Sequence, residues 1–230
     1  MAISVDTVYQ RVLALANKEQ RGYITPQEFN LLAGQAQMEI FEQYFYDAKS
    51  EDANLKNSTE FSNVDEILDE KISVFKTSGD VIISSGGEFG VLPTDLYRLG
   101  NVYNNSSMVE VEEITSTEAM YLLQSPLTSP TIQFPAFVRS SNSIINVYPN
   151  LSSISCNYIR LPSTPQWGYV VVNEKALYNN GTSTNFEIHI GDSSELVYKI
   201  LSLAGIVIAK PGLGTYGDQQ INTQKTQEKQ

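Results

Sequence analysis

The chain of 230 residues contains one cysteine, Cys156, and one histidine, His189. A single cysteine excludes an internal disulfide and any zinc site built from paired cysteines. A conventional catalytic triad has only His189 available as its base, and no G-x-S-x-G motif accompanies it. We therefore interpret Cys156 as a small apolar side chain in a strand and His189 as a residue on a strand face or at a helix entry.

Long apolar runs are also missing. The stretch from Leu203 to Ala209 is among the longest, and it falls far short of the roughly twenty residues that span a bilayer. The segment Met1–Asp6 has neither a basic cluster before an apolar run nor a small-residue cleavage site. The sequence therefore predicts a soluble protein with no membrane partner, and secretion through a cleaved signal is not expected.

Basic residues are scarce, since 15 Lys and Arg stand against 26 Asp and Glu, giving a net charge of −11. The excess is concentrated between Glu28 and Glu118, where eighteen acidic residues face five basic ones. Lys and Arg that neutralise phosphates supply most non-specific affinity for DNA, so the composition argues against tight duplex binding. The acidic segment is either a solvated face that maintains solubility or a surface past which nucleic acid slides.

The motifs that are present carry little chemistry. Gly212–Gly217 matches G-x-G-x-x-G, but it follows a predicted helix instead of a strand, and we interpret it as a hinge. Ser73–Lys76 matches S-x-x-K without the companion motifs of that chemistry. Glu110 and Glu112 share one face of a predicted strand next to Glu113, but no calcium-type loop surrounds them. The sequence therefore predicts no catalytic residue, no cofactor and no metal ligand.

Trp167 is the only tryptophan. It lies in the short segment Pro165–Tyr169, between two predicted strand regions. Such a residue closes the end of a sheet more often than it binds a ligand, although a binding aromatic stays an alternative.

Helical patterns occupy the first third of the chain. Apolar residues recur at helical spacing from Val5 to Ala16, and this helix should end before Gly22. Thr25–Glu28 has the pattern of a capping box and predicts a second helix with an apolar face from Phe29 to Tyr44. We expect an exposed loop over 47–63, then a third helix with apolar residues from Val64 to Phe75 that ends near residues 77–79.

Short runs rich in Val, Ile, Tyr and Phe follow, separated by Gly, Pro, Asn and Ser. This pattern is typical of antiparallel sheet, with tight turns at Asn104-Asn105 and Ser141-Asn142. A short helix over Thr117–Leu123, capped by Ser116 or Thr117, interrupts the strands. The predicted strands are Val81–Ser84, Arg98–Tyr103, Met108–Ile114, Ala136–Arg139, Ile144–Tyr148, Ser155–Arg160 and Phe186–Ile190.

A last amphipathic helix is expected from Asp192 to Ala209, packed against the first helices and halted at Lys210-Pro211-Gly212. A polar, Gln-rich tail follows, which either stays disordered or folds against a partner. The predicted fold class is α+β: an antiparallel helical bundle formed by N- and C-terminal helices, with an inserted antiparallel β-rich domain. The predicted parts are N-terminal helices (1–79), β-rich insert (80–190), C-terminal helix (191–211) and docking tail (212–230).

Both ends of the chain resemble a known family. Tyr9–Asn30 (YQRVLALANKEQRGYITPQEFN) and Ala36–Phe45 (AQMEIFEQYF) are similar to the opening of tailed-phage neck or tail ring proteins of crAss-like and related podophages. Glu195–Leu201 (ELVYKIL), Ala204–Ile208 (AGIVI) and Gln227–Gln230 (QEKQ) resemble the other end of that family. The β-rich middle of the chain resembles that family only in its general sequence character, as in Arg160-Leu161-Pro162 and Leu92–Tyr97.

This resemblance implies a structural virion protein at the head-to-tail junction, made in the host cytoplasm. Copies would form a cyclic homo-oligomeric ring that connects the portal to the tail, and residues 212–230 would grip a neighbouring tail ring protein. DNA would pass through without specific binding if the lumen is acidic, for which Glu66, Asp69 and Glu70 are candidates.

Two other functional classes stay open. The β-rich part suits a tail decoration or receptor-binding module. A phage-encoded hydrolase that uses paired carboxylates is the other alternative, since such a pair needs no rigid motif. The sequence contains no convergent set of catalytic residues, so we expect no enzyme.

Overall fold

The computed structural model describes residues 2–18, 24–54, 64–84 and 89–207, together with 219 and 222. The chain divides into two compact units. The helical unit comprises Met1–Val74 and Pro162–Gln230, and the barrel unit comprises Phe75–Leu161.

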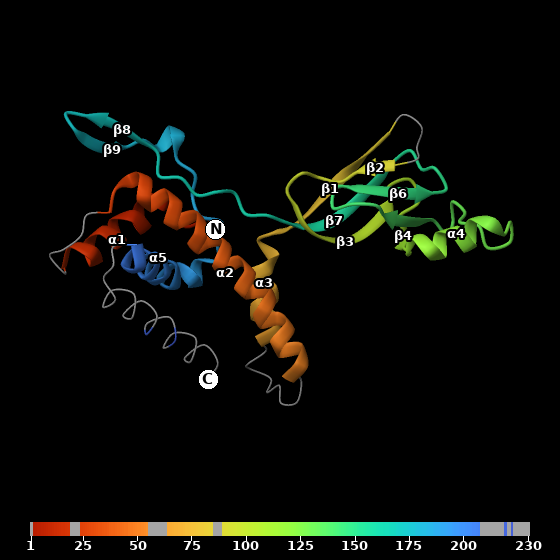
Figure 1. Ribbon diagram of the computed structural model, residues 1–230, viewed down its shortest axis with the longest axis horizontal. Helices are drawn as coiled ribbons and strands as arrows, with labels where there is room; N and C mark the ends of the chain where they lie inside the picture. Colours follow the sequence, from red (N-terminus) through yellow and green to blue (C-terminus); the bar gives the residue numbers. More distant parts are fainter. Residues whose placement is uncertain are drawn as a thin grey trace. The chain divides into compact units, whose positions relative to one another are not determined.

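The helical unit contains α1, α2, α3 and α5 (Figure 1). Their bounds are Val5–Lys18 (α1), Pro26–Asn54 (α2), Val64–Ser73 (α3) and Ser193–Val207 (α5). Helix α5 packs against α1 and α2, as the sequence predicts. This packing buries the apolar face of each helix, where a fully buried Leu, Ile or Phe contributes about 1.5–3 kcal/mol. The buried residues include Val5, Val8, Val12, Phe29, Ala33, Phe41, Leu196, Ile200 and Leu201.

The same unit carries a two-stranded hairpin, β8 (Tyr169–Val172) with β9 (Lys175–Tyr178) (Figure 1). Its two-residue turn, Asn173-Glu174, has positive φ at both positions, the conformation that joins twisted antiparallel strands most closely. Two 3-10 turns follow, η1 (Asn180–Thr182) and η2 (Ile190–Asp192), and η2 leads directly into α5.

Seven strands of the barrel unit close on themselves in the order β1-β2-β6-β5-β4-β3-β7. The core cluster is largely apolar and contains Cys156 and Tyr158, and its other buried residues include Val102, Phe137, Ile145, Val147 and Ile154. Helix α4 (Ser116–Gln124) connects β4 to β5, and these two strands are parallel because the chain crosses over between them. The strands are β1 (Lys76–Ile83), β2 (Phe89–Val91), β3 (Leu96–Asn104), β4 (Val109–Glu113), β5 (Ala136–Arg139), β6 (Ile144–Tyr148) and β7 (Ile154–Arg160).

The predicted fold class, a helical bundle with an inserted antiparallel β-rich domain, is wrong. The strands form a closed barrel that includes the parallel pair of β4 and β5, and a separate hairpin lies in the helical unit. Closure depends on β1 pairing with β7, for example Lys76 with Ile159. Local periodicity identifies strands but does not specify pairing between positions so far apart in the chain.

Several local predictions hold and others fail. The capping box forms, since the Thr25 amide donates to Glu28 Oε2 at 2.9 Å and the Glu28 amide donates to Thr25 Oγ1 at 3.3 Å. Helix α2 continues to Asn54, although a loop was expected from residue 47, and residues 77–79 belong to β1 instead of ending a helix. The predicted strand Phe186–Ile190 is absent, because Phe186 makes one isolated bridge to Ile3 and Ile190 begins η2.

Helix α4 begins at Ser116 and is capped by Thr115, whereas a helix beginning at Thr117 with Ser116 or Thr117 as its cap was predicted. The strands β5 and β6 have the predicted bounds, whereas β2, β8 and β9 were not predicted. Within the described ranges, no helix combines the length and the apolar character needed to cross a membrane. Gly22, residues 55–63 and residues 208–218, which include the expected helix stop and the Gly212–Gly217 motif, lie outside the described residues.

Candidate functional site

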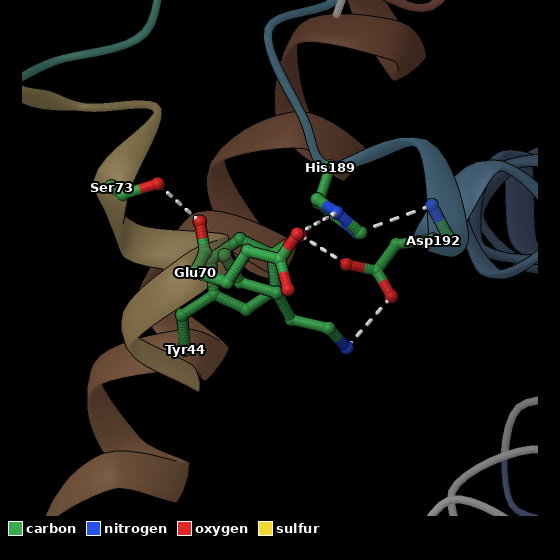
Figure 2. Close-up of polar contacts among 7 residues, drawn as sticks. Tyr44, Glu70, Ser73, His189 and Asp192 are labelled. Atoms are coloured by element: carbon green, nitrogen blue, oxygen red, sulfur yellow. Dashed lines mark hydrogen bonds and ion pairs between the residues drawn. The ribbon is translucent and has the colours of Figure 1, made fainter. Parts of the chain in front are cut away.

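A buried ion pair joins three elements of the helical unit (Figure 2). Asp192, the last residue of η2, has a side chain only 1% exposed. Lys71 Nζ from α3 donates to Asp192 Oδ1 at 2.9 Å, and the Tyr44 hydroxyl from α2 donates to Oδ2. Both carboxylate oxygens are thus satisfied, and the negative charge lies at the start of α5, where the helix dipole favours it.

The protonation of Tyr44 follows from this arrangement. Burial raises the pKa of the Tyr44 phenol far above its ordinary value, and the negative charge of Asp192 raises it further. The Lys71 ammonium lies 5.7 Å from the centre of the Tyr44 ring. Tyr44 therefore stays a hydroxyl donor over the physiological pH range, and the group acts as a clamp between α2, α3 and α5.

His189 lies beside this clamp but has a separate role (Figure 2). It caps η2, because its Nδ1 accepts from the Gly191 amide at 3.3 Å. Its Nε2 lies 3.7 Å from Glu70 Oε1, an ion pair only when the imidazole is protonated. The Ser73 hydroxyl donates to the Glu70 carbonyl oxygen at 2.6 Å, at the end of α3. The prediction that His189 occupies a helix entry is therefore confirmed, and Ser73 holds the end of a helix.

Cys156 and Trp167 both serve packing. Cys156 is buried in β7, and burial raises the pKa of its thiol to about 11, with the nearby Asp80 charge adding to the shift. Trp167 is 3% exposed, and its indole Nε1–H donates to Asp6 Oδ1 at 2.9 Å. Its ring lies 4.5 Å from that of Tyr9 between centroids, so it anchors the base of the β8–β9 hairpin to α1.

Glu110, Glu112 and Glu113 lie on β4 and are exposed. Among the residues that the structure describes, no group of three or more His, Cys, Asp or Glu side chains is arranged to hold a metal ion. Lys76, the other end of the S-x-x-K match, lies in β1 of the barrel unit, whereas Ser73 belongs to the helical unit.

The clearest candidate for function is an apolar surface that the sequence reasoning missed. On the β8–β9 hairpin the cross-strand pair Val170 and Leu177 is 50% and 53% exposed, and Val171 on the other face is 62% exposed. A solitary soluble protein normally places polar side chains on at least one face of a hairpin. The run Tyr169–Val172 between Gly168 and Asn173 was the available signal for this strand.

A second apolar surface lies in the barrel unit, on α4 and the segment that follows it. Met120 and Tyr121 of α4 are exposed, and so are Leu127, with 94% exposure, and Phe134, with 79%, in the segment that follows. Exposed apolar patches of this kind mark sites of protein contact. Each compact unit therefore exposes large apolar side chains of its own, and the two sets differ in residues and secondary structure.

Comparison with known proteins gave no matching family model and no matching curated relative.

Proposed function

We propose that this chain is a structural virion protein of a bacteriophage neck or tail. Copies of it form a cyclic ring that connects the portal to the tail and surrounds the DNA channel, with neighbouring tail ring proteins as further partners. The protein acts by assembly and not by catalysis, and its place is the virion after synthesis in the host cytoplasm. The resemblance of both chain ends to neck and tail ring proteins supports this proposal.

The exposed β8–β9 hairpin is the observation that carries it. A two-stranded hairpin is marginally stable alone in water, and this one exposes Val170, Val171 and Leu177 while its base is held by Trp167. A rigidly anchored apolar projection suits insertion into a neighbouring protein. The α4 surface is unlike the hairpin, and two unlike surfaces are what a head-to-tail interface in a closed ring requires.

The acidic face of α3 suits a channel for DNA. Glu66, Asp69 and Glu70 are all exposed along this helix. Carboxylates facing the duplex would gain nothing from counterion release, so DNA would slide past without binding. Reversal of these three charges should slow DNA ejection, and unchanged ejection would argue against a place in the lumen.

Quantitative mass spectrometry of purified virions tests the proposal directly. We expect the chain in the particle at a copy number close to that of the portal, on the order of a dozen. Absence from the particle would overturn the proposal. A copy number far above that of the portal would instead indicate a decoration protein.

A pair of leucine variants tests the role of the hairpin. Leu177→Glu should prevent incorporation into particles, because it places a charge in a surface that must be desolvated. Leu31→Glu is the matched control, since Leu31 is a 73% exposed residue on α2, outside both apolar surfaces. Equal incorporation of both variants would exclude the hairpin from the assembly interface.

A further inference from the structure

The wall of the barrel contains a groove of about 690 Å³ where β1, β3 and β7 run side by side. Its depth has a local cause. The pairing of β3 with β7 shifts register between Leu99 and Val102, and Gly100 lies at this irregularity. A Cβ on Gly100 would lie 2.8 Å from the Asn157 backbone oxygen, so only glycine allows the two backbones to approach this closely. The groove is therefore built into the strand pairing.

Two cations line this groove. Lys76 and Arg98 both pair with Ile159 in the strand register, one from each neighbouring strand, so they flank the same point of β7. The acidic segment from Glu28 to Glu118 has only five basic residues, and these are two of them. Ser78, Asn101 and Asn157 add hydrogen-bonding groups to the lining. The groove thus offers positive charge and polar donors for an anionic group.

An acidic groove of about 530 Å³ adjoins it on the same wall. Gly100 and Asn101 line both grooves. The carboxylates of Glu110, Glu112 and Glu113, all from β4, line the second one. The barrel therefore carries two hollows side by side, one lined by two cations and the other by three carboxylates.

We propose that the basic groove of one copy binds the β4 carboxylates of a second copy of this chain. The inference rests on the proposed ring and names one of its contacts. Charge complementarity selects this occupant, because each copy supplies both the cations and the carboxylates. A nucleic acid is a poorer fit, since its phosphates would meet the acidic groove next to the basic one. The basic groove and the β4 carboxylates are different sets of residues, so a contact from groove to strand that repeats from copy to copy around the ring is head-to-tail.

Matched charge reversals test the contact in the full-length protein by sedimentation velocity at low salt. Arg98→Glu and Glu112→Lys should each weaken self-association about tenfold or more, because each places like charges across the interface. Arg139→Glu and Glu42→Lys make the same changes of charge at exposed positions that line neither groove, and they should leave association unchanged. Added salt should weaken association of the wild type.

Rescue gives the decisive result. Mixing Arg98→Glu protein with Glu112→Lys protein should restore association, since every groove then faces a strand of opposite charge, and the double variant should associate with itself. Failure of the rescue would overturn the contact, as would weakened association of Arg98→Glu when Glu112→Lys associates as the wild type does. Wild-type protein that stays monomeric up to about 1 mM would overturn it as well.

The copy number in virions separates this inference from the proposed function. A portal-like copy number together with normal incorporation of Arg98→Glu would refute the groove contact and leave the ring intact. Absence of the wild-type chain from virions would refute the ring whatever the reversals do in solution.

Discussion

The two units of this protein are stabilised in different ways. The helical unit buries a charged carboxylate, Asp192, which pairs with the Lys71 ammonium and accepts a hydrogen bond from the Tyr44 hydroxyl. The core cluster of the barrel unit is largely apolar, and the buried Ser155 hydroxyl of β7 donates to Asp80 at 2.5 Å. Among the described residues, every buried side-chain nitrogen or oxygen has a hydrogen-bond partner. Both units bury apolar side chains; the helical unit adds a buried ion pair with directional bonds, and the barrel unit adds strand pairing.

Removal of the Asp192 charge should have the largest effect on stability. Asp192→Asn removes the buried carboxylate charge that pairs with Lys71 and should lower the free energy of unfolding by about 4 kcal/mol. Urea unfolding followed by the fluorescence of Trp167 measures this, because the only tryptophan lies in the helical unit. Glu42→Gln makes the same chemical change at an exposed site and should alter the free energy by less than about 0.5 kcal/mol. Equal losses of unfolding free energy in the two variants would show that the buried ion pair adds no more stability than an exposed carboxylate does.

A cavity in the barrel should cause the next largest loss of unfolding free energy. Ile145→Ala truncates a fully buried residue of β6 and should cost about 3 kcal/mol. Ile82, 72% exposed on β1, gives the control Ile82→Ala, which should change little. We expect the circular dichroism transition to shift while the Trp167 transition stays in place. If both transitions move together, the two units unfold as one, and the contrast drawn between them fails.

Loss of the Tyr44 hydroxyl should change how the stability of the helical unit depends on pH. Tyr44→Phe removes one charge-assisted hydrogen bond to Asp192 and should cost about 2 kcal/mol at neutral pH. The folded-state pKa of Tyr44 is raised, so its contribution is full below the unfolded pKa of about 10 and is lost as pH rises above it. The wild-type helical unit should therefore lose stability above about pH 10, and Tyr44→Phe should lose less over the same range.

The control for Tyr44 is Tyr46→Phe, at a residue 72% exposed on the same helix, which should leave both stability and its pH dependence unchanged. A wild-type pH profile that Tyr44→Phe does not alter would contradict the assignment of the alkaline transition to Tyr44.

The smallest effects come from the one motif that both units share. Thr25 with Glu28 caps α2, and Thr115 with Glu118 caps α4 through the same pattern of hydrogen bonds. Thr25→Ala and Thr115→Ala should each cost about 1 kcal/mol, the first in the helical unit and the second in the barrel unit. Separate transitions by fluorescence and circular dichroism would distinguish them.

The capping boxes also predict a shared response to acid. Hydrogen bonds from the Thr25 side chain and amide lower the pKa of Glu28, and those from the Thr115 amide and side chain lower the pKa of Glu118. A lowered folded-state pKa gives a contribution that is present above the unfolded pKa of about 4.3 and is lost as pH falls below it. Each Thr→Ala variant should therefore show a smaller loss of stability on acidification than the wild type.

The amino-acid sequence by itself determined the features that depend on neighbouring residues. The Thr25–Glu28 box, the apolar faces of α1 and α5, and the bounds of β5 and β6 follow from spacing of a few residues and were predicted. The placement of Cys156 in a strand follows in the same way, whereas the sequence left His189 at either a strand face or a helix entry and the structure shows the helix entry. In each case the decisive contacts lie within one or two turns or along one strand.

Only the tertiary structure decided the rest. Lys71 and Asp192 are 121 positions apart, and Tyr44 and Asp192 are 148 apart, so no local pattern marks them as partners. Barrel closure depends on β1 meeting β7, and the hairpin on positive φ at Asn173 and Glu174, where glutamate is an unusual choice. The candidate contact surfaces arise because closure and packing leave particular side chains outside. Exposure is a property of the folded chain, and the sequence alone does not state it.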